Sequence, residues 1–164
     1  MGIDTYVYGG IYMCILDDIF LSVHHKWLCF TPFLNVFALM YYYAFHQEKT
    51  RILNFISFFI AALTISTILF WYSPVRNDII HKIDKTIVHM VCFLVIGDVL
   101  FYKLFFQKWN RFVWFLYGIL LTLSGYFLYL SNYYSSLEWL SREHVYYHFW
   151  FHLFAKSGIW FIFL

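Results

Sequence analysis

Six long stretches of apolar residues follow one another along this chain, and they restrict its fold more than any other feature. A helix needs about 20 mostly apolar residues to cross a bilayer, and each stretch approaches that length. Backbone N–H and C=O groups in lipid must be satisfied within a helix or a closed barrel. These stretches are too long and too uniform for barrel strands. We therefore expect an all-α bundle of six transmembrane helices without β-structure.

The polar connections between the predicted spans are short, and none is long enough for a separate soluble domain. Residues 1–164 are therefore expected to form a single transmembrane domain. The first span is the least apolar, because it contains Asp17 and Asp18. The predicted spans are Thr5–Val23, Leu28–Phe45, Ile52–Tyr72, Ile83–Phe106, Phe112–Leu130 and Val145–Leu164.

Composition excludes several classes of protein. Hydrophobic residues make up 63% of the chain and charged residues only 12%, whereas a soluble domain has about 25% charged residues. The net charge is +2, and no basic stretch is long enough to follow a phosphate backbone, so nucleic acid is not an expected partner. We expect a multi-pass integral membrane protein surrounded by membrane lipids. Its membrane, its orientation and any homo-oligomer or protein partner stay open.

The last predicted span contains the clearest polar pattern. His144, His148, His152 and Lys156 recur every fourth residue, which places them along one side of a helix. His148 and His152 form an i, i+4 pair, and two imidazoles on consecutive turns can hold one metal ion. The alternative is that these side chains serve in packing or in hydrogen bonds between helices.

Charged side chains elsewhere in the predicted spans are further candidates for functional residues, because burial of a charge in lipid is energetically unfavourable and such groups often lie at functional sites. On the fourth span, His81 and Asp84 share a face one turn apart, and Asp98 follows on the same face. A pairing of Asp98 or Asp17 with Lys156 would lower the free energy required to bury both charges, and it would be structural rather than catalytic. Ser66 on the third span, taken alone, is expected to bond to its own backbone.

Taken together, the third, fourth and sixth spans resemble the CREST superfamily of membrane hydrolases and receptors. That superfamily includes the alkaline ceramidases, the progestin and adiponectin receptors, and myomaker. Its pattern is a Ser about four residues before a His, an Asp near the start of the next helix, and an HxxxH pair in the last helix. Ser66, Asp84, His148 and His152 stand in that order in this chain. The chain also resembles small membrane proteins of large DNA viruses.

The resemblance implies a zinc site, in which three histidines hold the ion and the Asp orients the bound water. This chain departs from the family at the first histidine, whose position falls on Phe70 or Trp71. His81 is the better candidate for the third ligand, and His25 is the alternative. The family has seven helices with three between the Asp and HxxxH helices, whereas this chain has one predicted span there.

Three functions are therefore compatible with the sequence, and whether the protein is an enzyme stays open. The first is a non-catalytic CREST-like protein that binds lipid, remodels membranes or takes part in assembly. The second is a zinc-dependent hydrolase of a lipid amide or ester, in which Asp84 and Ser66 are the catalytic residues. The third is a small transporter or proton channel, suggested by the intramembrane charges Asp17, Asp18, Asp98 and Lys156.

Overall fold

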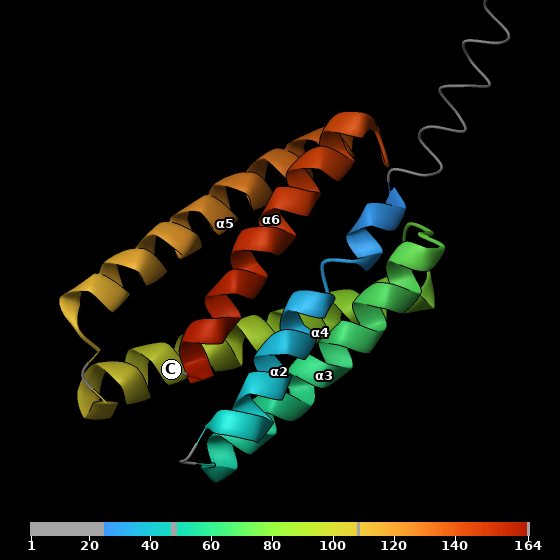
Figure 1. The fold of residues 1–164 in the computed structure, drawn as a ribbon. Coiled ribbons are helices and arrows are strands. Elements are labelled where there is room, and N and C mark those ends of the chain that lie inside the picture. The colour runs from blue at the N-terminus through green and yellow to red at the C-terminus, as the bar shows by residue number, and fades with distance from the viewer. Residues whose placement is uncertain (1–24, 47–48, 108, 164) are drawn as a thin grey trace, which may run out of the picture.

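The computed structural model describes residues 25–46, 49–107 and 109–163, and all regular structure in these ranges is helical. Three short elements accompany the long helices: η1 (His25–Cys29) precedes α2, the π-helix η2 (Asp98–Gln107) continues α4, and η3 (Phe161–Phe163) follows α6. The all-α prediction is confirmed for these ranges. The long helices are α2 (Phe33–Phe45), α3 (Arg51–Tyr72), α4 (Ile79–Gly97), α5 (Arg111–Leu137) and α6 (Arg142–Trp160) (Figure 1).

The described part thus contains five long helices, while the predicted first span, with Asp17 and Asp18, lies outside it. Four helical segments are long and apolar enough to cross a membrane. Helix α6 is not one of the four, because its histidines, tyrosines and lysine lower its mean hydropathy. The four segments are His25–Phe45, Arg51–Tyr72, Ile79–Phe105 and Arg111–Leu137.

Helix α2 begins at Phe33 rather than Leu28, because the 3-10 helix η1 precedes it. One boundary of α4 and one of α5 also differ clearly from the predicted ones. Helix α4 begins at Ile79 rather than Ile83, and α5 continues to Leu137 rather than ending at Leu130. Hydropathy marks where a chain can meet lipid, whereas a helix continues wherever its backbone hydrogen bonds and end groups allow. The polar residues at these two ends are therefore helical, although they contribute nothing to the apolar runs.

Side chains at the helix starts satisfy backbone N–H groups that have no partner within the helix. Thr50 accepts a hydrogen bond from the N–H of Leu53 at the start of α3, at 3.2 Å. Asn110 does the same for Val113 at the start of α5, at 2.8 Å. Ser141 accepts from His144 at the start of α6, at 3.2 Å. These caps fix where the helices begin.

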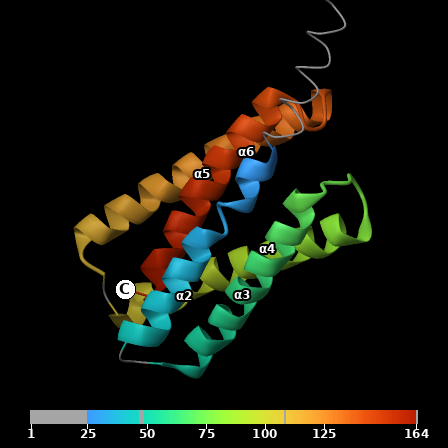
Figure 2. The same ribbon diagram turned by 45° about the vertical axis from the view of Figure 1, so that its right-hand side comes forward.

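The helices pack as two antiparallel pairs joined through α2 and α6. Helix α5 packs along α6, α3 packs along α4, and α2 contacts both α3 and α6. Both views show α4 and α5 meeting at their connection and diverging away from it (Figures 1 and 2). The main apolar core lies among α2, α3, α4 and the end of α6, and contains Ala38, Tyr42, Leu53, Ile56, Ile60, Leu63, Val91, Val95, Ile159, Ile162 and Phe163.

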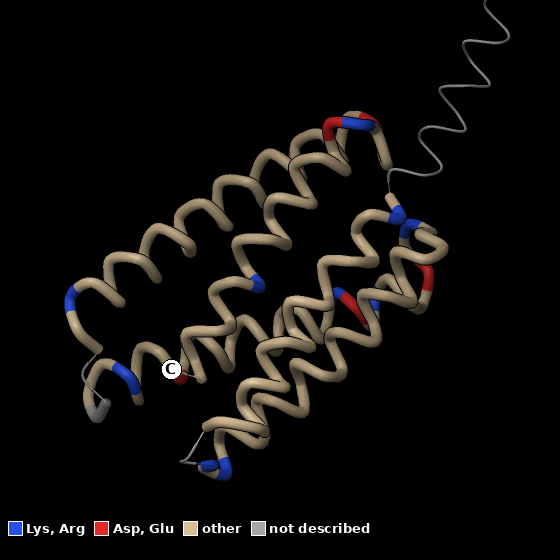
Figure 3. Tube along the Cα trace, viewed as in Figure 1, with Lys and Arg blue, Asp and Glu red and all other residues tan. Residues whose placement is uncertain are grey.

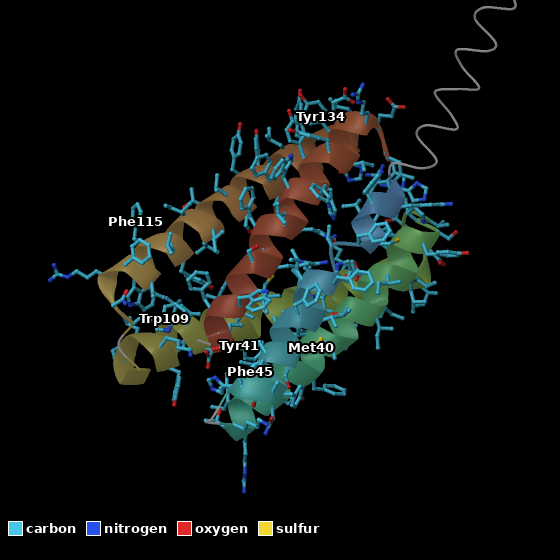
Figure 4. The ribbon with its side chains drawn as sticks, in the orientation of Figure 1. Met40, Tyr41, Phe45, Trp109, Phe115 and Tyr134 are labelled. Atoms are coloured by element: carbon cyan, nitrogen blue, oxygen red, sulfur yellow. The ribbon has the colours of Figure 1, made fainter. Side chains whose placement is uncertain are left out.

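Charged residues lie mostly at the ends of the helices, whereas large apolar side chains cover their outer faces. The tube in Figure 3 shows most Lys, Arg, Asp and Glu near the connections. Met40 and Phe45 on α2 and Phe115 on α5 project outward, and their exposed fractions are 61%, 73% and 65% (Figure 4). An outer surface of this kind is suited to an apolar surrounding.

Candidate functional site

A buried carboxylate joins α3 to α4. Asp84 lies two turns into α4, and its Oδ1 accepts hydrogen bonds from Ser66 Oγ at 2.7 Å and from Thr67 Oγ1 at 3.0 Å. All three side chains are buried. Ser66 Oγ also lies 3.1 Å from the carbonyl of Leu63, but it has one proton, and the carboxylate is the closer and stronger acceptor. Ser66 and Asp84, which the sequence placed in order, are therefore in direct contact.

The two histidines of the HxxxH pair face the interior of the bundle. Their ring centroids are 4.6 Å apart, so the imidazoles of His148 and His152 are neighbours on successive turns of α6. His148 Nδ1 lies 2.8 Å from Ser131 Oγ on α5, and His152 Nδ1 lies 2.8 Å from Thr31 Oγ1. Within the described part of the chain, neither Nε2 has a hydrogen-bond partner.

Thr31, between η1 and α2, connects the histidine pair to the lysine. Its hydroxyl donates to the carbonyl of Leu28 at 2.9 Å and accepts from Lys156 Nζ at 3.0 Å. The Thr31 oxygen thus lies within hydrogen-bonding distance of both the imidazole of His152 and the ammonium of Lys156.

Lys156 is the buried cation of this site, with an exposed fraction of 4%. It interacts electrostatically with Asp84, but it forms no ion pair within 4.0 Å with any described residue. Asp98 interacts with Lys103 instead, near the ring of Trp109. The structure therefore places Lys156 nearest Asp84 and does not show an Asp98–Lys156 pair. Helical periodicity places Asp84 and Asp98 on one face, but they lie about 20 Å apart along the helix axis, so Lys156 can lie near only one of them.

Trp71 occupies the space beside the histidine pair. Its ring centroid lies 4.8 Å from that of His148 and 6.3 Å from that of His152, and the side chain is 1% exposed. Phe70, one residue earlier, faces away from the pair and stacks on His81 at 4.8 Å. The position where the CREST pattern has its first histidine is thus filled by aromatic rings.

The two candidates for a third metal ligand are held elsewhere. His81 Nδ1 accepts a hydrogen bond from the N–H of Asn77 at 2.9 Å, and its ring packs between Phe70 and Trp139. His25 lies in η1, at the start of the described chain. Among the described residues, no group of three or more His, Cys, Asp or Glu side chains is arranged to hold a metal ion. A catalytic zinc site needs three protein ligands, so the described residues do not fit one.

The outer end of the site is closed by a cluster around Trp139, in the α5–α6 connection. Trp139 packs on His144 at 4.9 Å between ring centroids, and Arg76 lies over the indole ring at 5.4 Å. His144, 2% exposed, accepts a hydrogen bond from the N–H of Leu140 through Nδ1. Leu140 has a positive φ of 65°, which bends the chain back into α6. This cluster separates the polar site from that end of the bundle.

A cavity adjoins the polar site on its other side. It lies between α3, α4, α5 and α6, it is partly open to the surroundings, and its volume is about 110 Å³. Most of its lining is apolar, and Thr67, His152 and Lys156 contribute to the polar part. Lys156 is the only charged side chain among the lining residues of the described chain. The lining is therefore suited to an apolar group that ends in one polar group.

No family model, curated protein or solved structure matches this chain.

Four residues of the site were not predicted from the sequence: Thr31, Thr67, Trp71 and Ser131. Each of them contacts a predicted site residue that lies on another helix. Where the contact is a hydrogen bond, the two residues are 17 or more positions apart in the sequence. For Thr31, Thr67 and Ser131, the weak signal available was a hydroxyl residue within or next to an apolar segment. Such residues more often bond to their own backbone, so the signal could not single them out.

Proposed function

We propose that this chain is a multi-pass integral membrane protein, with six spans, that binds a lipid non-catalytically in a CREST-like helical bundle. The four long apolar helical segments support the location. The sixth span would be α6, whose polar residues His144, His152 and Lys156 are buried inside the bundle rather than exposed to lipid. The first span would be the segment that lies outside the described residues.

One observation carries the lipid-binding proposal: the cavity has apolar walls and a polar segment formed by Thr67, His152 and Lys156, which belong to the polar site. Ligand pockets are commonly lined by apolar side chains with a few placed polar groups. Residues of α4 and α5 line the cavity. These two helices diverge away from their connection (Figures 1 and 2), so a lipid chain would reach the cavity sideways from the bilayer.

Binding without hydrolysis is favoured by the aromatic rings at the histidine pair. In the CREST superfamily, which this chain resembles, hydrolysis of a lipid amide or ester requires a zinc-bound water. The described residues supply His148 and His152 as possible ligands, without a third. Trp71 fills the neighbouring space with an apolar ring. Asp84 and Ser66 then serve to position the polar wall of the cavity rather than to move protons in a reaction.

A pair of glycine substitutions tests the proposal. Gly158 on α6 lines the cavity, and a Cβ built there meets only the Tyr117 ring, at 3.9 Å. A Cβ at Gly125 on α5 meets no atom within 4 Å. We expect Gly158→Leu to reduce the lipid that co-purifies in mild detergent severalfold, as measured by mass spectrometry, while Gly125→Leu retains it. Equal lipid content in both variants and in the unmodified protein would contradict the proposal.

A further inference from the structure

We propose that Lys156 takes the place of a metal ion as the cationic centre of this site and selects a long-chain fatty acid, bound through its carboxylate. The inference rests on the proposed lipid-binding function and specifies the chemistry of the ligand. Its starting point is the mismatch between the described residues and a zinc site. A lipid site without a metal needs another group to fix the polar end of its ligand.

Lys156 meets the requirement for such a group. An ammonium buried in an apolar bundle is unfavourable unless an anion and hydrogen bonds compensate it. Among described residues, its one hydrogen-bond partner is the neutral Thr31 hydroxyl at 3.0 Å, and no carboxylate lies within 4.0 Å. Lys156 also lines the cavity. Two of the three N–H donors of the ammonium are therefore available to a ligand.

Asp84 does not remove the need for an anion. Its Oδ1 already accepts two hydroxyl hydrogen bonds, from Ser66 and Thr67, and the carboxylate acts on Lys156 only at a distance. The same negative charge restricts the ligand, since a dianionic phosphate would bring a second charge that no described cation of the cavity balances. A monoanionic carboxylate matches the single ammonium, and its apolar chain matches the rest of the cavity wall.

The test compares binding of four probes to the full chain in nanodiscs: palmitate, hexadecanol, palmitoyl lysophosphatidate and acetate. We expect palmitate to bind about tenfold or more tightly than hexadecanol, because a charge-assisted hydrogen bond replaces a neutral one. Lys156→Gln should reduce palmitate affinity to that of hexadecanol and leave hexadecanol affinity unchanged. Lys156→Arg should preserve the preference for palmitate. Lys85→Gln, at an exposed lysine of α4, is the matched control and should have no effect.

The outcomes separate this inference from the proposed function. Equal affinity for palmitate and hexadecanol, with both lost in Gly158→Leu, would overturn the role of Lys156 and retain the lipid cavity. Tighter binding of lysophosphatidate than of palmitate would overturn the monoanionic assignment, and competition by acetate at palmitate concentrations would overturn the need for a chain. Binding of no lipid probe, or binding that Gly158→Leu leaves unchanged, would overturn the proposed function and this inference with it.

Discussion

At the scale of single residues, Trp71 decides what the histidine pair can do. Ser66 is followed four residues later by Phe70, the position where the CREST pattern has a histidine. The helix turns Phe70 toward His81, however, and turns Trp71 toward His148 and His152. The residue whose identity matters for a metal is therefore Trp71, one position beyond the family spacing.

This geometry predicts that one substitution creates a metal site. Trp71→His places a third imidazole beside His148 and His152, which completes the ligand number of a catalytic zinc site. We expect the purified variant to contain close to one equivalent of zinc by elemental analysis, and the unmodified protein to contain a negligible amount. Phe70→His is the matched control and should gain none, because that side chain faces His81.

Two results would count against this view of the site. Stoichiometric zinc in the unmodified protein, lost in a His148→Ala, His152→Ala double variant, would favour the zinc-dependent hydrolase instead. Negligible zinc in Trp71→His, with the variant still folded by circular dichroism, would show that the three side chains do not converge.

At the scale of helices, the pairing of α3 with α4 depends on a polar contact as well as on apolar packing. Asp84 comes from α4 and both of its hydroxyl donors from α3, so the contact fixes the register of the two helices. The α5–α6 pair has a comparable contact between Ser131 and His148. Polar bonds between helices matter in lipid, because apolar surface alone does not drive helices together there.

We predict that Ser66→Ala destabilises the protein by about 1–3 kcal/mol, since it removes a donor from a buried carboxylate. The matched control is Ser136→Ala on α5. Both serines lie near the carbonyl three residues earlier, at 3.1 Å and 2.7 Å, but Ser136 is exposed and bonds to no carboxylate among described residues. The measurement is unfolding in mixed micelles followed by circular dichroism. Equal stability of both variants would show that the Asp84 contact contributes nothing.

At the scale of the whole molecule, the connections lie at two opposite ends of the bundle. Figures 1 and 2 show the α3–α4 and α5–α6 connections at one end and the α2–α3 and α4–α5 connections at the other. The charged residues follow the same division, since most lie near the helix ends (Figure 3). Such an arrangement is expected when each long helix crosses the same bilayer.

This arrangement predicts which sites share a side of the membrane. In a cysteine-free background, Ser73→Cys and Glu143→Cys should react with an impermeant maleimide from one side of a vesicle. Lys49→Cys and Arg111→Cys should react only from the other side. All four native residues are exposed in the structure. With six spans, tags at the two termini should share the side of Lys49 and Arg111, whereas tags on opposite sides would exclude an even number of spans.

The sequence alone determined that the chain is helical, because long uniform apolar runs leave few other solutions in lipid. It also determined which polar residues lie on one face of α6, because that follows from helical periodicity. Periodicity acts within one helix, so it could place His148 and His152 side by side. It could equally place Ser66 near the end of α3 and Asp84 near the start of α4.

Only the tertiary structure decided which helices supply the partners of these residues. Thr31 bonds to both His152 and Lys156 across 121 and 125 residues of sequence, a contact that no local pattern encodes. The choice between Phe70 and Trp71 depends on the rotation of α3 against α6. The choice of Asp84 rather than Asp98 as the carboxylate that acts on Lys156 depends on where α6 lies along the length of α4. The rotation and register of one helix against another depend on how side chains pack throughout the bundle. They therefore could not be predicted from the sequence of any single helix.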